Sequence, residues 1–209
     1  MAQTRDVILD AALTVIRERG LGKATTKAIA QEAGFSEAAL YKHFADKEEI
    51  FLGVLQERSP GFPPLQAALA VAPGAGTVEG NLVAIATAAM AFYHENFPLL
   101  GSIFAERRVF ETHRTRLTQK GAGPHKVNQA VAGYLQREQQ AGRVRADADA
   151  AALADLLMGC CFQHAFLRHY QGGAIERTGE RLREPPGVQS ASERAAERYV
   201  RALLPALTL

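Results

Sequence analysis

The sequence predicts an all-α fold, because apolar residues recur at helical spacing along most of the 209-residue chain. No stretch alternates convincingly between apolar and polar residues with the period of two that is typical of strands. Aromatic residues make up only 7% of the chain and Trp is absent, which disfavours a β-sandwich rich in aromatic pairs. With 47% hydrophobic residues, a chain of this length can bury a sizeable core.

Composition and the N-terminal segment narrow the class of protein. The first 20 residues contain Asp6 and Asp10 and no small-residue cleavage site, so we expect no signal peptide and a cytoplasmic location. The apolar runs fall short of about 18 residues, so we expect no membrane-spanning helix. The two cysteines are adjacent and form no disulfide framework. The net charge of +2 favours no class of partner, so any DNA binding must rest on local residues.

Four helices are predicted in the first 58 residues, and a residue suited to capping precedes each one. The candidate caps are Thr4, then Thr25 or Thr26, then Ser36 before a helix from Glu37 to Phe44, and finally Asp46, which forms a capping box with Glu49. Gly20 and Gly34 suit the positions just past the first two helices. Two short helices joined by a glycine turn and packed on a longer one are typical of a helix-turn-helix unit.

The second helix of such a unit can lie in the major groove of DNA. Small side chains at Ala38 and Ala39 would let the backbone approach thymine methyl groups. Longer side chains nearby can reach phosphates or base edges, and the start of the preceding helix offers backbone N–H groups to a phosphate. The candidate DNA contacts are Thr26, Lys27, Glu37, Ala38, Ala39, Tyr41, Lys42, His43 and Lys47.

A structural interpretation of this segment competes with DNA binding. Residues 1–58 contain eight Lys and Arg against nine Asp and Glu, which is a weak charge signal for a DNA-binding module. A three-helix packing unit with a solvated third helix would show the same periodicity. A further alternative is a dimeric scaffold that no longer binds DNA, although the presence of Tyr41, His43 and Lys47 argues against it.

Roughly over residues 4–58, the sequence resembles the TetR family of bacterial transcriptional regulators. The resemblance is carried by Thr25-Thr26-x-x-Ile29-Ala30-x-x-Ala33-Gly34-Phe35-Ser36 and by Leu40-Tyr41-x-His43-Phe44-x-x-Lys47-Glu48. It implies a DNA-binding domain over residues 1–50 and a larger helical domain over residues 51–209. That larger domain would bind a small effector and form a homodimer. It also implies a ligand-responsive repressor that binds a palindromic operator.

The family pattern places Thr26, Lys27, Ala38, Tyr41, Lys42, His43 and Lys47 at DNA-contacting positions. Glu37 is unusual beside phosphates. It can accept a hydrogen bond from a cytosine amine, or it can interact favourably with the positive end of its own helix, and we favour the second interpretation.

Further helices are predicted along the rest of the chain. Residues 59–79 are rich in Pro and Gly, with a short helix possible over residues 65–71. Helices are then expected over residues 80–96, from Pro98 in a first turn, over 106–118 and 125–141, from Asp147 or Asp149 to about Tyr170, and from Ser190 to about Leu204.

The last two predicted helices carry more apolar surface than a single core-facing stripe needs. Two such helices from each of two chains would form a four-helix dimer interface, as the family resemblance implies. Two recognition helices related by a two-fold axis and spaced about 34 Å apart would then read a palindromic operator. The alternative is that both helices pack only within a monomer.

The effector pocket is the least specific prediction, because aromatic residues at helical spacing more often belong to the core. Aromatic walls with a few polar groups suit a small apolar or amphipathic ligand. The candidates are Met90, Phe92, Tyr93, His94, Phe97, Phe104, Phe110, Tyr134, Cys161, His164 and Phe166. Residues 100–145 also contain nine Lys and Arg against three Glu, which indicates either solvated faces or contacts to an acidic effector.

Cysteine and histidine near residue 160 suggest three alternatives that we rank low. Adjacent Cys160 and Cys161 with His164 could sense redox state or bind a metal, but adjacent cysteines are poor tetrahedral ligands and few groups activate the thiols. A Cys161–His164 pair lies one helical turn apart, yet no oxyanion stabiliser or phosphate-binding loop accompanies it. We therefore expect buried structural cysteines, no metal, no cofactor and no enzymatic activity.

Overall fold

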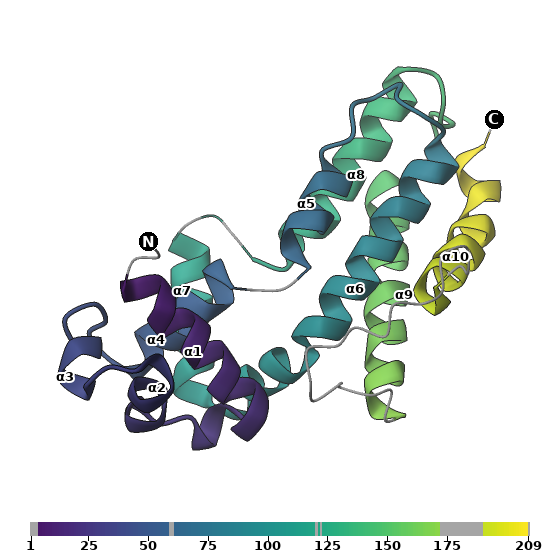
Figure 1. Ribbon diagram of the computed structural model, residues 1–209. Helices are drawn as coiled ribbons and strands as arrows, with labels where there is room; N and C mark the ends of the chain where they lie inside the picture. Colours follow the sequence, from purple (N-terminus) through teal and green to yellow (C-terminus); the bar gives the residue numbers. More distant parts are fainter. Residues whose placement is uncertain (1–3, 59–60, 120, 122, 172–189, 209) are drawn as a thin grey trace. The chain divides into compact units, whose positions relative to one another are not determined.

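The computed structural model describes residues 4–58, 61–119, 121, 123–171 and 190–208, and all regular elements within them are helical (Figure 1). The all-α prediction is therefore confirmed. The elements are α1 (Thr4–Arg19), the 3₁₀ turn η1 (Leu21–Lys23), α2 (Thr26–Ala33), α3 (Glu37–Leu40), α4 (Lys47–Glu57), α5 (Phe62–Leu69), α6 (Val78–Ala105), α7 (Arg107–Gln119), α8 (His125–Gln140), α9 (Ala150–Tyr170) and α10 (Ala191–Leu207).

The chain forms two compact units, and the division does not follow the sequence order. Unit 1 comprises Met1–Pro60 and Asn96–Gly121, whereas unit 2 comprises Gly61–Glu95 and Ala122–Leu209. Unit 1 therefore contains the predicted helix-turn-helix together with α7 and the C-terminal part of α6. The functional boundary expected at residue 50 stays a prediction.

Unit 1 has its own hydrophobic core. α1 packs on α2 and α4, and α4 contacts α7. Ile8, Ile29 and Leu40 are almost completely buried there. The same core includes Leu99 and Ile103 of α6, so residues far along the chain complete it.

Ion pairs join the start of α1 to the end of α4. Arg5 Nη2 donates to Glu57 Oε1 at 2.7 Å, which joins α1 to α4. Arg58 Nη2 donates to Asp6 at 2.6 Å and its Nε donates to Asp10 at 2.7 Å. Because these pairs are partly exposed, they orient the helices more than they stabilise them.

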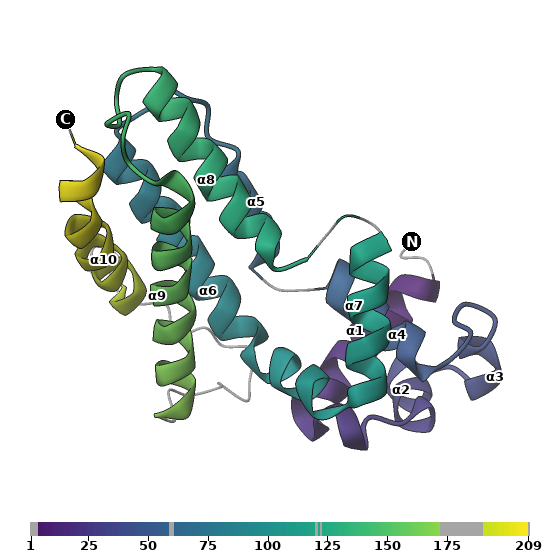
Figure 2. The ribbon, with the colours of Figure 1, turned by 180° about the vertical axis from the view of Figure 1, so that it is seen from behind.

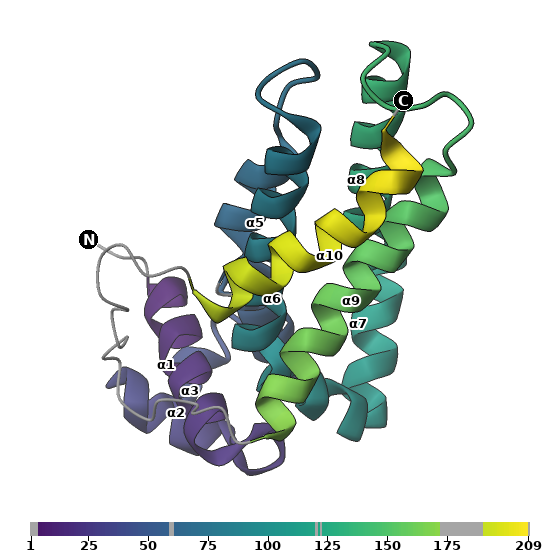
Figure 3. The same cartoon turned by 90° about the vertical axis from the view of Figure 1, so that its right-hand side faces the viewer.

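Unit 2 is built around a second core. α8 lies beside α9, α5 runs along α8, and α10 packs on α9 (Figures 2 and 3). The largest fully buried side chain is Tyr134 of α8, which lies among Leu82 and Ile85 of α6 and Leu157 of α9. α6, α8 and α9 therefore share one apolar interior.

A buried carboxylate connects α8 to the loop between α5 and α6. Glu138 is 0% exposed and accepts hydrogen bonds from Arg143 Nε at 2.6 Å and from the Gly74 N–H at 3.2 Å. Arg143 Nη1 in turn donates to the Gly76 carbonyl at 2.9 Å. Arg143, with a smaller contribution from Gly74, holds the pKa of Glu138 below its ordinary value. We call these four residues the Glu138 network.

Several predicted boundaries need correction. α3 ends at Leu40, not at Phe44, because the next residues tighten into a turn in which the His43 N–H bonds to the Leu40 carbonyl at 2.9 Å. No new helix begins at Pro98, which instead lies inside a continuous α6. Proline removes one backbone donor there, but the apolar residues that follow it in α6 continue into the unit 1 core.

Two other helices also differ from expectation. α5 begins at Phe62, earlier than predicted, because prolines occupy its first turn, where their missing N–H groups are not needed. α10 continues through Pro205 to Leu207. Of the alternative caps, Thr25 accepts from the Ala28 N–H at 3.1 Å and Asp149 accepts from the Ala152 N–H at 3.0 Å.

α9 bears on the expectation of no membrane-spanning helix without contradicting it. By length and composition it is the one helix in the described part of the chain that could cross a membrane. The sequence prediction missed it because Gly159 and Gln163 interrupt its apolar runs without adding charge. The core helix of a soluble protein passes the same test, and α9 buries seven residues in or beside the unit 2 core, so this is weak evidence for insertion.

Candidate nucleic-acid interface

The supporting helix α2 is fixed at both ends by local hydrogen bonds. The Thr25 hydroxyl caps its start. Gly34 ends it with φ of +71°, a left-handed conformation in which a side chain would be strained. The Phe35 N–H then bonds back to the Ala30 carbonyl at 2.9 Å. This short turn directs the chain into α3 and fixes the angle at which α3 leaves α2.

α3 is attached to unit 1 mainly through one side chain. The Ser36 hydroxyl accepts from the Ala39 N–H at 3.3 Å and caps the helix, while Leu40 is 1% exposed and anchors its end. All other α3 side chains are at least partly accessible. The helix therefore presents most of its surface to solvent.

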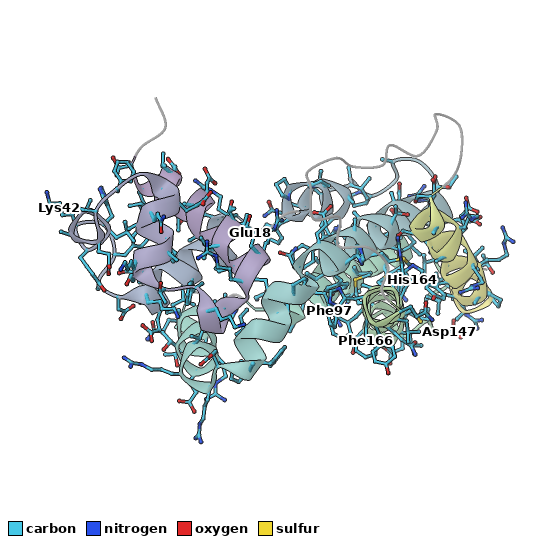
Figure 4. The ribbon with its side chains drawn as sticks, turned by 60° about the horizontal axis from the view of Figure 1, so that its bottom comes forward. Glu18, Lys42, Phe97, Asp147, His164 and Phe166 are labelled. Atoms are coloured by element: carbon cyan, nitrogen blue, oxygen red, sulfur yellow. The ribbon has the colours of Figure 1, made fainter. Side chains whose placement is uncertain are left out.

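The predicted reading surface is accessible in the structure. Tyr41 is 53% exposed, and Glu37, Ala38, Lys42 and His43 are exposed, while Ala39 is half-buried. Figure 4 shows Lys42 at the outer edge of unit 1. Small side chains thus lie at the start of α3, and longer hydrogen-bonding side chains follow at its end, which is an arrangement suited to base edges and phosphates.

Glu37 has a partner that the sequence did not indicate. The Thr26 hydroxyl donates to Glu37 Oε2 at 3.0 Å, so the first residues of α2 and α3 are joined. Glu37 also lies in the first turn of α3, where a negative charge is favourable. This contact occupies Thr26, one of the predicted phosphate contacts, while the neighbouring Lys27 is exposed.

Lys47 is directed toward unit 1 in this structure. Its Nζ lies 3.4 Å from the Leu21 carbonyl oxygen and 4.9 Å from the centroid of the Phe51 ring. Asp46 caps α4 by accepting from the Glu49 N–H at 2.7 Å. Lys47 is thus the first residue of a helix and is half-buried, and contact with a phosphate would require its ammonium group to exchange the Leu21 carbonyl for that phosphate.

The predicted effector residues do not gather in one place. Phe97, Phe104 and Phe110 belong to unit 1, where the Phe104 and Phe110 rings lie 5.3 Å apart. The remaining eight belong to unit 2. Within that group, Met90, Tyr134 and Cys161 are almost fully buried in the core.

The other five side chains of that group lie on α6 and α9. Phe92 contacts Tyr93, and Tyr93 contacts Phe162 of α9 edge-on at 5.4 Å. Burial raises the pKa of Tyr93 to about 12. Figure 4 shows His164 on the α10 side of α9 and Phe166 on the opposite side, where Phe166 is 42% exposed and stacks on Tyr170.

A polar cluster between α6, α9 and α10 was only partly predicted. Buried atoms without a hydrogen-bond partner among the described residues include Thr87 Oγ1, His94 Nδ1 and His164 Nε2. Burial, then the positive charge of Arg168, lowers the pKa of both histidines. The sequence prediction missed Thr87 and Arg168, although Thr87 is seven residues from His94 and therefore lies on the same face of α6.

Several arginines of the basic segment 100–145 form ion pairs within the protein. Among the basic residues of segment 100–145, Arg107, Arg108, Arg143 and Arg145 each pair with an acidic residue.

Cys160 is half-buried and Cys161 is buried, and neither forms a disulfide. Burial raises the pKa of Cys161 to about 12. The described residues contain no group of three or more His, Cys, Asp or Glu that could hold a metal ion.

Comparison with known proteins matches the N-terminal segment to a family. Residues 8–54 match the model of bacterial regulatory proteins of the tetR family. The HTH-type transcriptional repressor BepR of Brucella suis is 44% identical over 54 residues, which are 26% of each chain. The uncharacterized HTH-type transcriptional regulator YvkB of Bacillus subtilis is 23% identical over 84% of this chain and 88% of its own.

Solved structures share the fold over the whole length. A protein from Mesorhizobium loti assigned to the TetR family has a TM-score of 0.75 and 23% identity, covering 99% of this chain and 97% of its own. SmeT, the repressor of the Stenotrophomonas maltophilia multidrug efflux pump SmeDEF, has a TM-score of 0.65 and 19% identity, covering 100% and 92%. At these identities the likeness establishes the fold alone.

The helix-turn-helix unit and the larger helical remainder define a DNA-binding transcriptional regulator. Residues 8–54 match the tetR family of bacterial regulatory proteins, and the chain as a whole shares the helical fold of solved TetR-family regulators.

Proposed function

We propose that the protein is a ligand-responsive repressor that binds a palindromic operator as a homodimer in the cytoplasm. The observation that carries the proposal is the exposed surface of α3, which offers small and hydrogen-bonding side chains on a helix held by Ser36 and Leu40. Two relatives that share the fold or the N-terminal segment, BepR and SmeT, are repressors by name. The operator-facing surface is assigned to Thr26, Lys27, Glu37, Ala38, Ala39, Tyr41, Lys42, His43 and Lys47. Within it Thr26 and Glu37 bind each other, so we assign Glu37 to shaping this surface and not to a base contact.

A mobility-shift titration tests the DNA contacts. We expect Lys42→Ala to weaken operator binding about tenfold and to reduce the slope of log affinity against log salt by about two, because the homodimer contains two copies of Lys42. Arg17→Ala is the matched control, because Arg17 is also an exposed cation of unit 1 but lies on α1. If Lys42→Ala and Tyr41→Ala both bind as tightly as the wild type, the assignment of α3 as the reading helix is wrong.

The proposed dimer uses α9 and α10. α9 exposes Leu156, Phe162, Phe166 and Leu167, each at least 42% accessible, on a single helix. Contiguous apolar surface of this kind marks an interaction site. Sedimentation at micromolar concentration should give twice the 22.6 kDa mass of the chain, and a monomer would contradict the proposal.

The proposed effector site is the polar cluster of Thr87, His94 and His164, beside Tyr199 of α10. The His164 and Tyr199 rings meet edge-on at 6.3 Å. Buried polar atoms without partners are costly, and a ligand that hydrogen-bonds to them removes that cost. Such a ligand releases the operator if it binds the DNA-incompetent conformation more tightly.

A thermal-shift screen of small molecules tests the effector site. A compound that stabilises the wild type and releases the operator should lose both effects in His94→Phe. His113→Phe is the matched control, because His113 is a half-buried histidine of unit 1 whose pKa burial also lowers. A compound that acts equally on His94→Phe would place the effector elsewhere.

Catalysis by the Cys161–His164 pair is not part of this proposal. A catalytic cysteine acts as the thiolate, and burial raises the pKa of the Cys161 thiol to about 12. Burial also lowers the pKa of His164. Both shifts favour neutral side chains, so the pair lacks the charge separation that an activated nucleophile needs.

A further inference from the structure

The exposed face of α9 is broader than a single apolar stripe. Its accessible residues follow one another at spacings of three and four along almost the whole helix. They are Ala151, Ala152, Asp155, Leu156, Gly159, Phe162, Gln163, Phe166, Leu167 and Tyr170. Of these, Leu156 is 57% and Tyr170 is 80% exposed. We call this surface the α9 face.

Gly159 lies at the middle of this face, both along and around the helix. At about 100° per residue, Gly159 and Gln163 lie within about 20° of the line that joins Ala152 to Tyr170. The flanking residues Asp155 and Leu167 lie about 60° away on either side of the same line. A shallow groove surrounds the position and is lined by Ala152, Asp155, Leu156, Gly159, Cys160 and Gln163.

Nothing within the described part of unit 2 accounts for a glycine at this position. Gly is the poorest helix former after Pro, and Gly159 is placed well inside a 21-residue helix. A Cβ atom built on Gly159 would have no neighbour within 4 Å, so the chain itself does not exclude a side chain. The backbone of Gly159 is not in the positive-φ region either.

The α9 face is also suited to contact with a copy of itself. In an isologous contact the residues close to the two-fold axis lie near their own counterparts, so unpaired charges near the axis would repel one another. The α9 face contains one charged residue, Asp155, and its carboxylate accepts from Asn128 Nδ2 of α8 at 2.6 Å. Toward its C-terminal end the face is aromatic, with Phe162, Phe166 and Tyr170.

We propose that α9 of one chain crosses α9 of a second copy at Gly159, where the missing side chain lets the two backbones approach closely. This inference rests on the homodimer proposed above and identifies the point at which its two halves meet. Ala152 and Gln163, one to two turns away on the same line, flank the crossing. Leu156 of each chain then packs beside Gly159 of the other.

Two glycine-to-alanine variants test the crossing, because helix propensity and close packing predict opposite signs. Gly101 of α6 is the control, since it is also an exposed helical glycine whose Cβ would have no neighbour within 4 Å. Both substitutions improve helix propensity, so Gly101→Ala should raise the thermal midpoint and leave the dimer dissociation constant within twofold of the wild type. Gly159→Ala should weaken the dimer at least tenfold in sedimentation equilibrium.

A larger side chain at position 159 should weaken the dimer further. Gly159→Leu should sediment as a monomer at micromolar concentration while its circular dichroism retains the helical signal of the wild type. A Gly159→Ala dimer as tight as the wild type or tighter would overturn the crossing while leaving the dimer itself intact. A wild-type protein that sediments as a monomer would instead overturn the dimer and the crossing together.

Discussion

The turn between α2 and α3, residues 34–36, which we call the α2–α3 corner, and the Glu138 network each fix a connection between helices. They do so through different kinds of contact. Around α3, residues three apart in the sequence form the caps, as Ser36 does with Ala39, and these contacts are exposed to water. In the Glu138 network, a carboxylate that is 0% exposed joins residues 64 positions apart. Exposed local contacts contribute little free energy each, whereas a buried polar contact is costly to break.

The anchor of α3 should give the largest change in stability. Leu40→Ala removes a side chain that is 1% exposed, and we expect the free energy of unfolding to fall by about 3 kcal/mol. Urea denaturation measures this loss. Tyr41→Ala, at the next and exposed position, should change stability by less than about 0.5 kcal/mol. Equal losses in the two variants would show that α3 is not anchored through Leu40.

The Glu138 network should rank second. Glu138→Gln removes the charge that Arg143 pairs with, and we expect a loss of about 2 kcal/mol at pH 7, because Arg143 can still reach water. Asp147→Asn breaks an exposed pair with Arg145 and should leave the unfolding midpoint almost unchanged. A Glu138→Gln protein as stable as Asp147→Asn would remove the contrast between the two corners.

The same variant predicts a pH dependence. Arg143 holds the pKa of Glu138 below its ordinary value of 4.5, so the stabilisation is fully present above that pH. It is lost as the pH falls through the lower pKa of the folded state. The stability difference between the wild type and Glu138→Gln should therefore shrink when denaturation is measured at successively lower pH below about 4.5. A constant difference would contradict the ion pair.

The cap of α3 should give a smaller effect. Ser36→Ala removes the hydroxyl that accepts from the Ala39 N–H, and we expect a loss of about 1 kcal/mol in urea denaturation. Ser36→Gly should cost only a few tenths, because water can reach the freed backbone group. If Ser36→Ala lowers the free energy of unfolding more than Glu138→Gln does, the exposed caps stabilise the protein more than the buried network, and the contrast between the two regions is wrong.

The smallest expected effect concerns the Thr26–Glu37 contact. Glu37→Gln keeps the hydrogen-bonding shape but removes a negative charge beside the proposed phosphate contacts. Stability should change by less than about 0.5 kcal/mol, while operator affinity should rise about threefold at low salt. Weaker binding by Glu37→Gln in a mobility shift would instead indicate that the carboxylate itself contacts a base.

This contrast explains which features the sequence predicts. Caps at Thr25, Ser36 and Ser190 depend on residues three positions away, so the pattern locates them directly. The partner of Glu138 at Gly74 depends on the packing of α8 against the loop before α6, and no local pattern encodes it. The shortened end of α3 was missed because Tyr41–His43 suit a helix as well as a turn.

In the candidate sites, too, features set by nearby residues could be predicted, and features set by long-range packing could not. The outward residues of α3 could be named from helical spacing, because one buried residue, Leu40, determines which face is free. The inward turn of Lys47 toward Leu21 could not, since it depends on where η1 packs. For the effector, His94 and His164 were named as polar groups on apolar helices, and the seven-residue spacing from His94 could also have indicated Thr87. The effect of Arg168 on His94 depends on how α6 and α9 pack together, so no local pattern predicts it.

The contribution of Leu99 and Ile103 to the core of unit 1 bears on how such regulators can be recombined. Relatives share the N-terminal segment at 43–44% identity over 54–56 residues, which suggests a module that could be exchanged at a single junction. The core does not end there, because α6 and α7 supply its last apolar side chains. A chimaera that transplants residues 1–58 alone should fold poorly, whereas one that also carries residues 96–121 brings its own interior with it.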